Sequence, residues 1–98
     1  MDGMDEAGLK TRKLDPALRA ILDQGTLERV PVIVQTVDGL KDDDRRMVES
    51  LGGRVKDDLY IINAYSAELS AKAIEMMILS DRVLKIFHDA EVRAHQAR

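Results

Sequence analysis

The stretch from Val30 to Leu51, VPVIVQTVDGLKDDDRRMVESL, holds a strand and the helix that follows it. β-Branched residues dominate residues 30–35, and this composition predicts a strand. Both alternating faces of the segment are apolar at its centre, so we expect cover on both sides. Pro31 donates no ladder hydrogen bond and must lie at the strand's start. Residues 41–51 predict a helix, because apolar residues recur at helical spacing and Gly52-Gly53 follows directly.

Strands and a helix follow in the second half of the chain. We expect a strand over 54–60, a tight connection around 61–63, a strand over 64–69, a helix over 71–80 and a strand over 83–88. In the strand over 64–69, Tyr65, Ala67 and Leu69 alternate with small or polar residues, so one face is apolar. A short helix over 15–24 precedes all of these elements, with Asp15 as its N-cap and Pro16 at its first position.

The order strand, helix, strand, strand, helix, strand predicts an α+β fold, a ferredoxin-like βαββαβ sandwich. Right-handed crossovers would put both helices on one face of a four-stranded antiparallel sheet and leave the other face open. The short N-terminal helix is added to this unit. We expect a flexible N-terminal arm over residues 1–13, one domain over 14–91 and an extended C-terminal tail over 92–98.

Composition excludes several classes of function. The chain has 98 residues, 45% of them hydrophobic, which suits one folded domain and not a disordered chain. The net charge of −3 and the three aromatic residues argue against nucleic-acid binding. No apolar run is long enough to span a membrane. With no cysteine and two isolated histidines, we expect no metal and no other cofactor.

Two polar motifs invite a chemical interpretation. His88-Asp89 has the residue types of a catalytic pair, but no positioned nucleophile or Gly-x-Ser-x-Gly turn accompanies it, so we expect no enzymatic activity. Asp42-Asp43-Asp44 lacks the alternating ligands of a calcium loop, and a solvated helix N-terminus explains this run better.

Three blocks of the chain resemble the propeptide and inhibitor family of subtilisin-like serine proteases. They are Gly52-Gly53-Arg54-Val55, the stretch Ile62–Leu69 (INAYSAEL), and Ser80–Ile86 (SDRVLKI) leading to Asp89-Ala90-Glu91-Val92. The spacing of the blocks matches as well, over about residues 30–94. The resemblance implies a ferredoxin-like fold that acts as an intramolecular chaperone and then as a temporary inhibitor of the protease. It also implies a secreted protein that is monomeric when free.

The resemblance further implies which residues bind the protease. The open sheet face would pack on two surface helices of the protease, and acidic residues after the last strand would cap those helices. Asp89 matches one of these acids, whereas Phe87 and His88 stand where others would be, and Glu91 would compensate. The tail would lie in the substrate cleft like a cleaved product; its residues are Val92, Arg93, Ala94, His95, Gln96, Ala97 and Arg98.

A different class of function stays open on the same fold. A small-molecule-binding regulatory domain would pair two sheets side by side in a dimer and bind its ligand at the junction. The long tail after the last strand argues against this alternative, and the mass in solution would discriminate the two.

Overall fold

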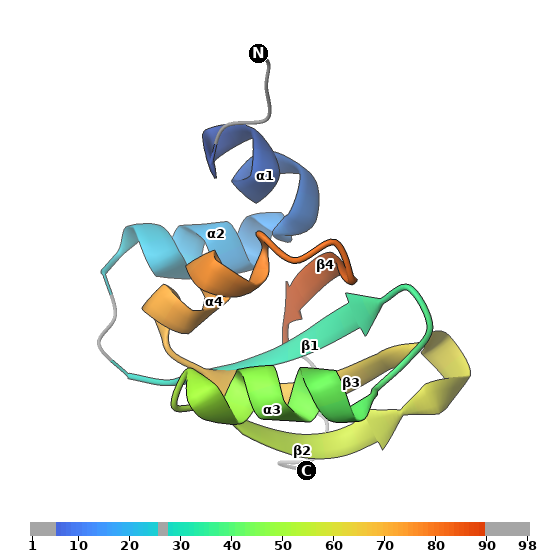
Figure 1. The fold of residues 1–98 in the computed structure, drawn as a ribbon. Helices are drawn as coiled ribbons and strands as arrows, with labels where there is room; N and C mark the ends of the chain where they lie inside the picture. The colour runs from blue at the N-terminus through green and yellow to red at the C-terminus, as the bar shows by residue number, and fades with distance from the viewer. Residues whose placement is uncertain (1–5, 26–27, 90–98) are drawn as a thin grey trace, which may run out of the picture.

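The computed structural model describes residues 6–25 and 28–89, and Figure 1 shows its fold. The elements are α1 (Glu6–Lys13), α2 (Pro16–Asp23), β1 (Val30–Thr36), α3 (Asp42–Ser50), β2 (Arg54–Leu59), the 3₁₀ turn η1 (Tyr60–Ile62), β3 (Ala64–Leu69), α4 (Ala71–Met77) and β4 (Val83–His88). The expected strands are confirmed, and their ends differ from the expected ones by at most one residue. The helix expected over 71–80 is shorter and ends at Met77.

The four strands form one antiparallel sheet in the order β2-β3-β1-β4. β1 lies in the middle of the sheet, between β3 and β4. In this register Val34 of β1 stands opposite both Tyr65 of β3 and Ile86 of β4. Because side chains alternate along a strand, these three residues share one face of the sheet. The chain is therefore α+β, as expected.

Helices α2, α3 and α4 cover this face, in front of the sheet in Figure 1. Each helix turns its apolar stripe inward, through Leu18 of α2, Val48 of α3 and Ile74 of α4, all fully buried. Fully buried Met77 and Ile78 complete the cluster at the end of α4. The expected apolar stripes are thus confirmed, and they make one core between the helices and the sheet.

Capping residues start α2 and α4 and end α3 where the sequence predicts. Asp15 Oδ2 accepts a hydrogen bond from the N–H of Ala17 at 3.1 Å, and Ser70 Oγ accepts one from Ala73 at 3.1 Å. Each bond satisfies an N–H that has no partner within its own helix. At the end of α3, Gly52 adopts φ of +83°, a conformation that favours glycine.

The N-terminal segment differs from the expected flexible arm. Residues Glu6–Lys13 form α1, which packs beside β4, while residues 1–5 lie outside the described residues. Lys13 is buried and its Nζ donates hydrogen bonds to the carbonyl oxygens of Ile78 at 2.8 Å and Ser80 at 2.9 Å. These two acceptors lie just after α4, so Lys13, which is distant in sequence, caps the C-terminal end of α4. The sequence EAGLKTRK has no strong apolar stripe, so contacts with the rest of the fold stabilise this helix.

Candidate functional site

The face of the sheet opposite the helices is the first candidate surface. The strand register places six half-buried residues of β1, β3 and β4 on it, here called the open face: Pro31, Ile33, Gln35, Glu68, Lys85 and Phe87. No helix in the described part of the chain covers it (Figure 1). The expected cover on both sides of β1 is therefore wrong for the described residues, since the helices pack against one side alone.

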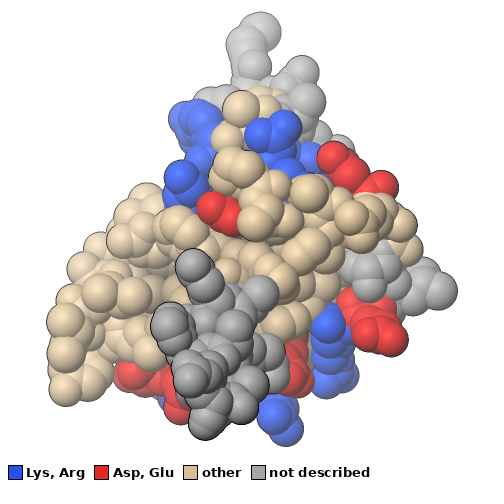
Figure 2. All heavy atoms as spheres, turned by 180° about the vertical axis from the view of Figure 1, so that it is seen from behind, with Lys and Arg blue, Asp and Glu red and all other residues tan. Residues whose placement is uncertain are grey.

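The open face is apolar at its centre. Ile33 of β1 stands opposite Phe87 of β4 and Ser66 of β3. Lys85 Nζ lies 5.6 Å from the centroid of the Phe87 ring, so the ammonium group stacks on the aromatic face. Figure 2 views the molecule from this side; among the described residues it shows a largely uncharged surface with a few acidic and basic side chains. Such a surface suits a contact with another apolar surface.

Asp89 stands directly after β4, as the resemblance requires of a helix-capping acid. Its N–H donates to the carbonyl oxygen of Pro31 at 3.0 Å, which extends the ladder between β4 and β1 by one residue. Residue Asp89 is 7% exposed, and its Oδ1 is buried with no hydrogen-bond partner among the described residues. This oxygen can still accept a hydrogen bond, but it is buried in the structure, so an N–H of another molecule reaches it only if the residues around it move.

The remaining residues expected to bind a protease fall outside the described part of the chain. They are Glu91, Val92, Arg93, Ala94, His95, Gln96, Ala97 and Arg98. Their roles stay predictions from the resemblance.

β4 forms one edge of the sheet, and this edge is protected by Leu14 and Asp15, which lie at the expected start of the domain. Leu14 makes a parallel bridge with Ile86, and the N–H of Asp15 donates to the carbonyl oxygen of Ile86 at 3.0 Å. An unpaired edge strand can add to the sheet of another chain. Here the pairing at Ile86 occupies the middle of the edge, so strand addition could begin only beyond it.

A buried ion pair lies between α3 and the start of β4. Asp44 is 3% exposed and receives two hydrogen bonds from Arg82, from Nε at 2.9 Å and from Nη2 at 2.7 Å. Arg82 Nη1 also lies 2.9 Å from Asp38 Oδ1, and its Nη2 donates to the carbonyl oxygen of Gly39. One guanidinium therefore joins the loop before α3, the first turn of α3 and the turn before β4.

The expectation of a solvated acidic run is wrong for Asp44, although Asp42 and Asp43 are exposed as expected. Burial by itself would raise the pKa of Asp44, but the hydrogen bonds from Arg82 and from the N–H of Lys41 outweigh it and hold this pKa below its usual value. The hydrogen bonds that Arg82 donates to Asp44 raise the pKa of Arg82. Asp44 and Arg82 are both charged at neutral pH, and the role of the pair is structural, because it holds three segments of the chain together.

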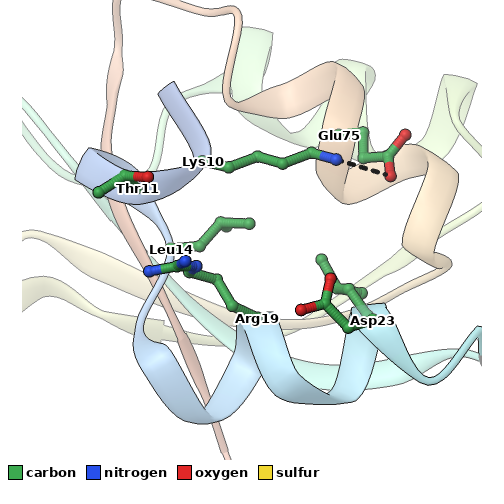
Figure 3. A pocket seen from close by; sticks show the side chains of 7 residues that line it. Lys10, Thr11, Leu14, Arg19, Asp23 and Glu75 are labelled. Carbon is green, nitrogen blue, oxygen red and sulfur yellow. Dashed lines mark hydrogen bonds and ion pairs between the residues drawn. The ribbon is translucent and has the colours of Figure 1, made fainter. Parts of the chain in front are cut away.

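A small pocket of about 190 Å³ opens between α1, α2 and α4. Figure 3 shows Lys10 of α1 reaching towards Glu75 of α4, with the ion pair at 3.4 Å, while Arg19 and Asp23 rise from α2 below them. Buried Leu14 forms part of its lining. Opposite charges already pair across this space, so it offers no strong field for a charged ligand.

The described residues hold no group of three or more histidine, cysteine or acidic side chains that could bind a metal ion. Within the same residues, no helix has the length and apolar character to cross a bilayer. Comparisons of the chain with models of protein families, with curated proteins and with solved structures found no match.

Proposed function

We propose that this chain is a propeptide-type inhibitor and intramolecular chaperone of a subtilisin-like serine protease. It acts without catalytic chemistry of its own and without a cofactor. Its target works outside the cell, where such proteases are secreted. The observation that carries the proposal is the open face: a four-stranded sheet packs three helices on one side, while its other side presents Ile33 and Phe87 with no described helix over them.

We assign the fold to the ferredoxin-like type. The strand order β2-β3-β1-β4 supports this assignment, because β1 and β3 are central and each is linked through a helix to an edge strand. α3 links β1 to β2, and α4 links β3 to β4. Both crossovers lie on the same side of the sheet in Figure 1, which is the arrangement of two interlocked βαβ units.

The proposed inhibitory contact has two parts. The open face packs on two helices of the protease, and Asp89 accepts hydrogen bonds from free N–H groups at the start of one of them. Oδ1 of Asp89 has no partner but is buried, so this contact requires that the oxygen become accessible when the protease binds. The tail from Val92 to Arg98 then lies along the substrate cleft as a product would, paired by main-chain hydrogen bonds.

A rigid base strengthens such a contact. β4 is paired with β1 along one side and with Leu14 on the other, so the strand that leads into the tail is fixed before binding. Less conformational freedom is lost on binding when the binding segment starts from a fixed point. As a chaperone, the same surface would bind the two protease helices before the protease core closes and so lower the folding barrier.

The decisive experiment measures inhibition of a panel of purified subtilisin-like proteases by the full chain and by a chain that lacks residues 93–98. We expect inhibition by the full chain, and a loss of at least about tenfold in potency on truncation, since the cleft contact is removed. Asp89→Asn keeps the size of the side chain and tests the helix cap by itself. Undiminished protease activity in a large excess of the full chain, with no gain in protease refolding, contradicts the proposal.

The alternative of a small-molecule regulatory domain would use β2 as the free edge for a side-by-side dimer. A bulge interrupts β2 between Val55 and Asp57, and exposed Asp57 and Asp58 follow it. Bulges and charges discourage edge-to-edge pairing. The described edge therefore favours the inhibitor, and a tight dimer in sedimentation analysis would favour the regulatory domain.

A further inference from the structure

The turn between β2 and β3 exposes three large apolar side chains in succession. Tyr60 is 72% exposed, Ile61 is 82% exposed and Ile62 is 54% exposed. Together with Leu59 and Asp58 they line a shallow hollow of about 290 Å³. We call Leu59–Ile62 the η1 patch. In Figure 2 the end of the molecule where this turn lies, at the left, shows an uncharged surface.

The η1 patch is held in place by the backbone around it. Asn63 ends the turn at φ of +55°, and its N–H donates to the carbonyl oxygen of Tyr60 at 3.2 Å. The carbonyl oxygen of Asn63 accepts a hydrogen bond from the N–H of Thr36 at 2.9 Å, which ties the turn to the end of β1. Turns of this kind are usually built from glycine, asparagine and aspartate. Folding therefore gives no reason for three exposed apolar residues, whereas a binding surface does.

Charge next to the patch decides between possible occupants. Asp57 and Asp58 are exposed and directly precede it. A second copy of the chain docked by two-fold symmetry would bring the same acids towards their counterparts. An anionic lipid surface would repel them as well. The complementary occupant is a protein surface with an apolar hollow and basic residues on its rim.

The patch is also continuous with the open face. Leu59 stands opposite Ala64, and Ala64 stands opposite Gln35 of the open face. A surface that covers the open face would reach the turn along this row of residues.

We propose that the η1 patch is a second contact with the protease, outside its substrate cleft, where an apolar hollow rimmed by lysine or arginine receives Ile61. This inference rests on the proposed function. It adds a determinant of which protease the chain recognises, since the tail would fit the cleft of many proteases while the patch needs its own receptor. Acidic residues beside it would speed the encounter with a basic rim.

The test uses the protease that the wild-type chain inhibits best among the panel. Ile61→Ser should weaken inhibition about tenfold or more, because it removes an apolar side chain that would become buried in the complex. Leu79→Ser is the matched control, since Leu79 is 56% exposed in the turn after α4 and should leave the inhibition constant within about twofold. Asp58→Lys should slow association, most at low salt. Tyr60→Ser provides a second variant, and thermal unfolding checks that each variant is folded.

The outcomes separate this inference from the proposed function. Inhibition by Ile61→Ser and Tyr60→Ser at wild-type potency overturns the second contact and leaves the inhibitor intact. A wild-type chain that inhibits none of the proteases overturns both. A dimer in sedimentation analysis that Ile61→Ser dissociates, or binding to anionic phospholipid vesicles that Ile61→Ser abolishes, overturns the choice of a protease as occupant.

Discussion

Replacement of Arg82 by methionine should destabilise the fold by about 3 kcal/mol at neutral pH. Removal of one member of a buried ion pair typically costs about 3–5 kcal/mol, because the other charge stays buried without its partner. The lower end applies here, since the side chain of Arg82 is 28% exposed and water can reach part of the cluster. Asp44 keeps the hydrogen bond from the N–H of Lys41 at 2.9 Å and loses both bonds from the guanidinium.

Urea unfolding followed by far-ultraviolet circular dichroism measures this change. In a domain of this size the expected loss corresponds to a fall in Tm of roughly 12–24 °C. Arg82→Lys keeps the charge but cannot bind the carboxylate with two parallel bonds, so it should recover part of the loss. Arg46→Met is the matched control, because Arg46 pairs with Asp43 in an exposed contact of 3.2 Å and should change stability by less than about 0.5 kcal/mol.

The pH dependence gives a second, independent readout. The pKa of Asp44 in the folded chain lies below its ordinary value of 3.8, so the ion pair contributes fully above that pH. Its contribution is lost as pH falls through the lower, folded-state pKa. The difference in unfolding free energy between wild type and Arg82→Met should therefore shrink below about pH 4. A difference under about 0.5 kcal/mol at pH 7, or one that is unchanged at pH 3, refutes the role of the pair.

Three further substitutions test the packing, each by thermal unfolding. Gly53→Ala should lower the free energy of unfolding by about 1–3 kcal/mol, because the added Cβ would lie 2.6 Å from a backbone oxygen of β3. The control Gly52→Ala meets open space and should lower it by about 1–2 kcal/mol, because Gly52 has a positive φ. If Gly53→Ala is as stable as the wild type, the clash is contradicted. Lys13→Met should cost about 1–3 kcal/mol because two carbonyl oxygens after α4 lose their donor, while Arg12→Met, at an exposed neighbour, should be near neutral. Leu18→Ala should cost about 2–5 kcal/mol, and a smaller effect would place α2 outside the core.

Local sequence patterns were sufficient for most of the fold. β-Branched composition marks β1, the alternation of Tyr65, Ala67 and Leu69 marks the buried face of β3, and the caps at Asp15 and Ser70 mark helix starts. These signals are reliable because each is carried by neighbours in the chain. Asp89 was also singled out from the sequence, and the structure adds that its Oδ1 is buried without a partner.

Other features depend on residues far apart in the chain, and no local pattern encodes them. α1 has a charged sequence with little apolar periodicity, yet Lys13 is buried because the carbonyl oxygens of residues 78 and 80 lie beside it in the fold. Asp44 belongs to a run of three acids that looks solvated, and Arg82, 38 positions away, makes it a buried ionic partner.

The sequence by itself determined the four strands and helices α2, α3 and α4, their order and the face that each turns to the core, because periodicity and capping act within a few residues. Tertiary structure alone decided which side of β1 stays without helices, how Leu14 closes the edge at Ile86, and that Ile61 is exposed beside two acids. Those properties arise when segments distant in sequence pack together and exclude water. The burial of such a side chain depends on these contacts and is not encoded by the residues next to it in the chain.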